Sequence, residues 1–96
     1  MALSIEQIQD KLKNFTGWEI KDSALEKTYR ASDFMKAIDL MNKVAVIAES
    51  LDHHPDMFLR NYNQITFRTW THHEEAITDK DFALIKEIEK VVVDLM

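Results

Sequence analysis

The spacing of hydrophobic residues in the first third of the chain changes from helical to extended. Ser4 opens a Ser-x-x-Gln capping box, and the apolar residues after it recur every three or four positions. This spacing predicts an amphipathic helix over residues 5–15, stopped by Gly17. From Trp18 the period falls toward two on either side of the polar pair Asp22-Ser23, which predicts a β-hairpin with its turn there.

A longer helical pattern follows and predicts a central helix of about five turns. Ser32 is the expected N-cap. The apolar residues that keep the spacing of one buried face are Phe34, Ala37, Ile38, Met41, Val44, Ala45 and Ala48. A stripe of this length is typical of a helix that packs against a core rather than of a cofactor-binding box.

The last forty residues predict a second hairpin and a closing helix. Met57–Tyr62 and Gln64–Thr71 are the expected strands, with the turn near Asn63; the second strand alternates and is rich in β-branched and aromatic residues. Thr78 and Asp81 form another capping box. The apolar stripe of the closing helix is Phe82, Ile85, Ile88, Val92 and Leu95.

The resulting order, α-β-β-α-β-β-α, predicts an α+β fold: a single four-stranded antiparallel sheet with three helices packed on one face. With 96 residues and 46% apolar content, we expect residues 1–96 to form a single domain. The other sheet face and the open edge strands are then available to a second copy of the chain, so a homo-oligomer is expected.

Composition excludes several classes of function. The net charge is −5 and the basic residues are dispersed, so direct binding of nucleic acid or of an anionic membrane is not expected. The absence of cysteine excludes disulfides, thiolate nucleophiles and cysteine-ligated zinc. No signal peptide is recognisable, and no apolar run approaches the roughly 20 residues that span a bilayer, so we expect a cytoplasmic protein.

The densest group of titratable side chains lies where the central helix pattern ends, in the segment Glu49–Asp56. A hairpin turn near Asn63 makes residues face each other when their numbers sum to about 126, which brings His72 close to His53-His54. Carboxylates that can orient these imidazoles are Glu49, Asp52 and Asp81.

Imidazoles with an ordinary pKa near ~6.5 can donate and accept protons around neutral pH, so the cluster is suited to acid–base chemistry. Pro55 keeps His54 out of helical geometry and turns the chain. Two alternatives are a histidine pair that only caps the helix carbonyls and a zinc site of three histidines. His73 is interpreted as a solvated loop neighbour, and Trp70 as a platform for a planar ligand or part of a subunit contact.

The spacing of the site residues resembles a known family. Glu49, His53-His54-Pro55, Tyr62, His72 and Asp81 are separated by three, six, nine and eight residues. This pattern resembles the signature of the pterin-4a-carbinolamine dehydratases, also called 4a-hydroxytetrahydrobiopterin dehydratases. The resemblance implies an α+β fold, a homodimer or homotetramer, and a hydro-lyase that recycles pterin without a metal or organic cofactor. It also implies a functional link to an aromatic amino acid hydroxylase.

The resemblance further implies roles for individual residues in dehydrating a 4a-hydroxytetrahydropterin to a quinonoid dihydropterin. His53 and His72 would form the acid–base pair, and His54 would hold the pterin. Supporting roles are implied for Glu49, which would bind pterin or orient His53; for Asp81, which would support His72; and for Thr71 and Pro55, which would line the pocket.

The chain departs from the family pattern at two positions of one loop. Ala76 stands where many relatives have glycine, and His73 stands where an acidic residue is common. These departures bear on the preference for the substrate side chain. An alternative function, also implied by the resemblance, is a non-catalytic relative that serves dimerisation, protein assembly or molybdopterin metabolism.

Overall fold

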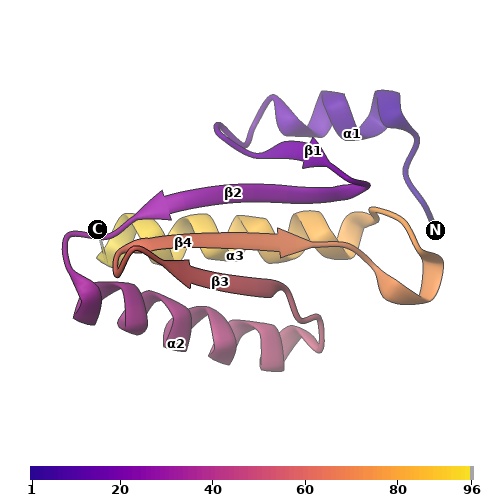
Figure 1. The fold of residues 1–96 in the computed structure, drawn as a ribbon. Helices are drawn as coiled ribbons and strands as arrows, with labels where there is room; N and C mark the ends of the chain where they lie inside the picture. The colour runs from indigo at the N-terminus through magenta and orange to yellow at the C-terminus, as the bar shows by residue number, and fades with distance from the viewer. Residues whose placement is uncertain (96) are drawn as a thin grey trace.

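The computed structural model describes residues 1–95, which form a four-stranded antiparallel sheet and three α-helices (Figure 1). In chain order the elements are α1 (Ile5–Leu12), β1 (Glu19–Lys21), β2 (Ala24–Arg30), α2 (Phe34–Leu51), β3 (Asp56–Arg60), β4 (Gln64–Thr69), a 3₁₀ turn η1 (His72–Glu74) and α3 (Asp79–Leu95). The strands are arranged β1-β2-β4-β3, so β1 and β3 are the edges. The predicted fold class and element order are confirmed.

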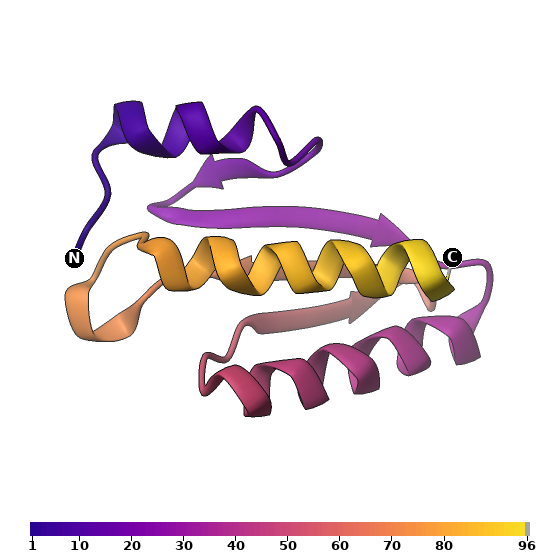
Figure 2. The ribbon, with the colours of Figure 1, turned by 180° about the vertical axis from the view of Figure 1, so that it is seen from behind.

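The helices cover one face of the sheet. Seen from behind in Figure 2, α3 crosses in front of the strands and α2 lies beside it. The core between these layers contains the buried side chains Leu25, Tyr29, Leu40, Val44, Ile65, Phe67, Leu84, Ile85 and Ile88. The segment after α1 joins this core because the rings of Phe15 and Phe82 pack with their centroids 5.8 Å apart. Burial of these side chains fixes α3 against the sheet.

The first helix is shorter than its apolar pattern predicts. The Ser4 capping box is present, but α1 ends at Leu12, and Phe15 reaches the core from a turn. Gly17 therefore does not stop the helix. It lies in the turn before β1 with a φ of +87°, a backbone conformation that favours glycine.

The first hairpin turns at the predicted residues. Asp22 and Ser23 have φ values of 49° and 66°, the left-handed pair that matches the twist of a two-residue hairpin. Lys21 pairs with Ala24 across this turn.

The N-cap of α2 is Asp33, so the prediction of Ser32 is wrong. The backbone of Asp33 is extended, and its carboxylate accepts a hydrogen bond from the Lys36 N–H at 2.7 Å, which satisfies a free donor of the first turn. On the buried face, Leu40 is fully buried because it lies three residues after Ala37 and four before Val44.

The turn of the second hairpin lies one residue earlier than predicted. Arg60 pairs with Gln64, so the numbers of paired residues sum to 124, and Asn61 and Tyr62 take left-handed conformations. The Asn63 side chain is buried instead and donates to the Ala31 carbonyl at 3.0 Å. If the ladder were extended, His54 would face Trp70 rather than His72.

Candidate functional site

Backbone groups, not histidine side chains, cap the end of α2. Asp52 takes a left-handed conformation with a φ of 50° and donates its N–H to the Glu49 carbonyl at 3.2 Å. The His53 N–H donates to the Ala48 carbonyl at 3.0 Å, which completes a Schellman motif. Because the helix carbonyls are satisfied in this way, the imidazole rings that follow are available for other contacts.

A compact loop brings the second set of site residues to the same end of the sheet. After β4 the chain passes through Trp70 and Thr71 into η1, and Thr71 forms a bridge with Ala76 before α3 begins. Because β3 and β4 are antiparallel neighbours, the start of β3 lies beside the end of β4. The segment before β3 and the segment after β4 therefore meet.

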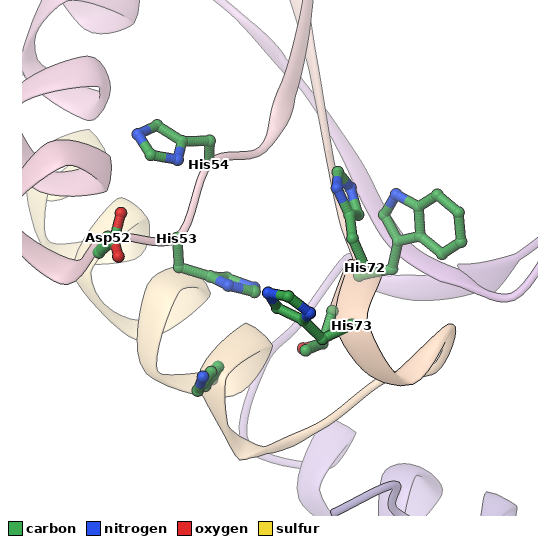
Figure 3. Close-up of a pocket in the computed structure, with 8 residues that line it drawn as sticks. Asp52, His53, His54, His72 and His73 are labelled. Carbon is green, nitrogen blue, oxygen red and sulfur yellow. The ribbon is translucent and has the colours of Figure 1, made fainter.

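These segments enclose a pocket of about 390 Å³. The residues that line it are Asp52, His53, His54, Trp70, Thr71, His72, His73 and Lys80. Figure 3 shows the rings of His53 and His73 turned toward one another and the ring of His54 directed toward α2. The three histidines predicted as catalytic thus border one cavity.

Asp81 is the buried centre of a hydrogen-bond network behind this pocket. Its side chain has no solvent exposure. One carboxylate oxygen accepts from His53 Nε2 and from the Thr69 hydroxyl, both at 2.6 Å. The other accepts from the Thr71 hydroxyl and the Thr78 N–H, both at 2.9 Å. Buried carboxylates need such donors, and this one is fully supplied.

The network also assigns proton positions. The Thr71 hydroxyl has one proton, which it donates to Asp81, so the Thr78 hydroxyl donates to Thr71 Oγ1 at 2.6 Å. The Thr78 oxygen in turn accepts the Lys80 N–H at 3.2 Å. His53 Nε2 donates to the carboxylate, which leaves Nδ1 as the ring nitrogen that does not contact Asp81.

Two carboxylates contact different histidines from those expected. Asp81 was expected to support His72, but it holds His53, because His53 leaves the end of α2 above the first turn of α3. Glu49 was expected to bind pterin or orient His53, but its carboxylate lies 3.3 Å from His54 Nε2 on an exposed surface. His54, five residues after Glu49, contacts it because the left-handed conformation of Asp52 reverses the direction of the chain.

Not every expected site residue lines the pocket. Glu49, Pro55 and Asp81 are outside its lining, whereas Asp52 and Thr71 belong to it. His73 was interpreted as a solvated loop neighbour; it is exposed on η1, and it also lines the pocket.

The sequence pattern does not single out Lys80 as a site residue, and it does not decide between the two interpretations of Trp70. The signal available for Lys80 was its place directly before Asp81 in the first turn of the last helix.

Two further features of residues 1–95 concern other classes of site. Within residues 1–95, no group of three or more His, Asp or Glu side chains is arranged to hold a metal ion, so the three-histidine zinc alternative lacks a ligand set there. In the same range, none of the helices has the length and apolarity needed to cross a membrane.

Comparison with known proteins gives a consistent result over nearly the whole chain. The family model described as pterin 4 alpha carbinolamine dehydratase matches residues 1–91. A protein of Sulfurisphaera tokodaii with the provisional name of a pterin-4-alpha-carbinolamine dehydratase is 37% identical over 94% of this chain and 96% of its own length. The Arabidopsis thaliana protein named pterin-4-alpha-carbinolamine dehydratase 2, mitochondrial, is 33% identical over 97% of this chain and 52% of its own length.

Solved structures with the same fold are also known. A Brucella melitensis protein described as a transcriptional coactivator/pterin dehydratase superposes with a TM-score of 0.90 at 28% identity, covering 95% of this chain and 98% of the other. A pterin dehydratase-like protein described as a RuBisCO assembly factor has a TM-score of 0.63 at 11% identity, over 77% of this chain and 84% of its own, which shows a shared fold only. The match over residues 1–91 shows that the chain belongs to the pterin 4 alpha carbinolamine dehydratase family.

Proposed function

We propose that this protein is a hydro-lyase that dehydrates a 4a-hydroxytetrahydropterin to the quinonoid dihydropterin. The observation that carries the proposal is the pocket that His53, His54 and His72 border in a chain of this family. Relatives bear the dehydratase name, and the likeness to them extends over most of the chain. A pocket of about 390 Å³ is within the range of small-molecule sites.

The proposed reaction needs one proton donor and one proton acceptor. Hydroxide is a poor leaving group, so the 4a-oxygen must gain a proton as its bond to carbon breaks. A ring N–H must lose its proton as the new double bond forms. Positioned imidazoles can do both near neutral pH, because each exists in donor and acceptor forms there.

In this mechanism, His53 and His72 form the acid–base pair, and His54 holds the pterin. Asp81 accepts the His53 Nε2 proton, so the buried carboxylate fixes the ring, and Nδ1 is the atom left to exchange a proton with the substrate. His54 is 55% exposed at its side chain and is oriented by Glu49, which suits a binding role at the pocket rim.

The reaction as proposed requires neither a metal nor an organic cofactor. Loss of water transfers no electrons, and both proton transfers are assigned to protein side chains. Turnover is therefore expected to continue at the same rate after exhaustive treatment with a chelator.

We also propose that residues 1–96 form a single domain and that copies of this domain assemble into a homodimer or homotetramer. β1 and β3 are open edges, and exposed apolar side chains occur on α2 at Met35 and Val46 and on β3 at Phe58. Light scattering on the purified protein would give a single-chain mass if this proposal were wrong.

The test of the enzymatic function is a dehydration assay with a synthetic 4a-hydroxytetrahydropterin. Wild-type protein should accelerate loss of water, and His53→Ala or His72→Ala should reduce kcat by about 10²–10⁴-fold, the usual contribution of a positioned acid or base. Lys90→Ala, which removes an exposed ion pair far along α3, is the control and should match wild type. Wild-type rates in both histidine variants would exclude the catalytic roles.

A second candidate function is partner binding without catalysis. It is favoured by the Brucella protein, which is described as a transcriptional coactivator as well as a pterin dehydratase. Absence of turnover on any 4a-hydroxypterin, together with a stable complex with another protein, would favour this function over the enzyme.

A further inference from the structure

His53 and His54 each have a carboxylate within hydrogen-bond distance, whereas His72 has none. Asp81 holds His53, and Glu49 approaches His54. Within residues 1–95, no hydrogen bond or ion pair involves the His72 ring. His72 is exposed and lies on a single 3₁₀ turn, a setting in which an imidazole would otherwise rotate among several rotamers.

An aromatic ring takes the place of the missing carboxylate. The rings of Trp70 and His72 lie with their centroids 4.8 Å apart and their planes at 62° to each other. This is the edge-to-face arrangement that aromatic pairs prefer. Figure 3 shows His72 on the side of the pocket opposite His54.

The backbone on either side of Trp70 is anchored, which limits where the indole can lie. Trp70 is half-buried and lies between β4 and Thr71, whose hydroxyl is fixed by the buried Asp81. Both backbone groups of Thr71 are bonded to Ala76, at 2.8 and 3.3 Å. The segment that carries Trp70 is therefore anchored on both sides.

We propose that Trp70 is a positioning residue that fixes the His72 ring for proton transfer. This inference rests on the proposed dehydratase function, because it gives a reason why His72, the one of the three proposed catalytic histidines without a carboxylate partner, acts in a fixed geometry. The indole acts through His72 and is not assigned a contact with the reacting atoms. Small errors in the position of an acid or base are costly, so loss of the support should reduce kcat.

Two variants separate positioning from the alternatives of ligand stacking and subunit contact. Trp70→Leu removes the ring, and Trp70→Phe keeps an aromatic face. Positioning predicts that Trp70→Leu lowers kcat by about 10- to 100-fold with KM unchanged, and that Trp70→Phe restores most of the rate. A raised KM with unchanged kcat would instead indicate stacking on the pterin, and a reduced oligomeric mass would indicate a subunit contact; either result overturns the inference.

A spectroscopic measurement tests the contact without any substrate. In wild-type protein the indole ring current should displace the His72 ring proton resonances, and Trp70→Leu should abolish that displacement while the His53 resonances stay in place. Identical His72 resonances in wild type and Trp70→Leu would overturn the inference. If wild-type protein shows no turnover, the proposed function fails, whereas this measurement still decides whether Trp70 orients His72.

Discussion

At the scale of single residues, Asp81 connects the stability of the fold to the chemistry of the site. Its carboxylate is fully buried and accepts from one imidazole, two hydroxyls and one backbone N–H. A buried network of this kind stabilises the fold only while every member has a partner. The same residue should therefore matter both for folding and for the orientation of His53.

Replacement of Asp81 by alanine should lower the free energy of unfolding by roughly 3 kcal/mol, because it leaves buried donors without an acceptor. Urea denaturation monitored by circular dichroism would measure the loss. Asp79→Ala is the matched control in the same helical turn, since its carboxylate is exposed and its ion pair with Lys11 is superficial. Equal losses in the two variants would contradict the role of the buried network.

At the scale of elements, the ends of α2 decide where the site lies. Asp33 sets the start of the helix, and left-handed Asp52 ends it immediately before His53. The direction in which the histidines leave the helix follows from this C-terminal motif. A shift of the end by one residue would turn the rings to another side, since successive residues of a helix point 100° apart.

Asp33→Ala should lower the free energy of unfolding by about 1 kcal/mol, the usual cost of losing an N-cap. Ser32→Ala is expected to have little effect, because the helix cap is the Asp33 carboxylate. Thermal or urea unfolding of the two variants, compared with wild type, would decide which residue caps the helix. A larger loss in Ser32→Ala would show that the assigned cap is wrong.

At the scale of the whole molecule, a second polar cluster joins α3 to the first hairpin. Glu89 accepts from Trp18 Nε1 at 2.9 Å and from Lys27 Nζ at 2.8 Å. The neighbouring Tyr29 hydroxyl is buried and has no hydrogen-bond partner within residues 1–95. Burial, with a further contribution from the negative charge of Glu89, raises the pKa of Tyr29 well above its ordinary value of 10.0.

This raised pKa predicts a loss of stability at alkaline pH. The unfolded chain releases the Tyr29 proton near pH 10, before the folded chain does, so the free energy of unfolding falls above that pH by about 1.4 kcal/mol per unit. Tyr29→Phe should remove this contribution, and unfolding measured from pH 8 to 11 should show a smaller alkaline loss. Tyr62→Phe is the control, because the Tyr62 ring is exposed; an unchanged slope in Tyr29→Phe would exclude the effect.

The sequence by itself determined the element order, the first hairpin turn, the α1 capping box and the family resemblance. These depend on periodicity, turn chemistry and residue spacing, which are local properties of the chain. It could not decide between Ser32 and Asp33 as a cap or place the second turn within one residue, because neighbouring polar residues satisfy the same local pattern.

Tertiary structure alone decided which carboxylate faces which histidine, that His73 and Lys80 border the pocket, and that Trp70 contacts His72. The physical reason is that a side chain's direction depends on the strand register and on how the helix ends. A difference of one residue turns a strand side chain to the opposite face, and the sequence pattern is not accurate to one residue. Spacing could therefore predict that the histidines gather, while only packing assigned their partners.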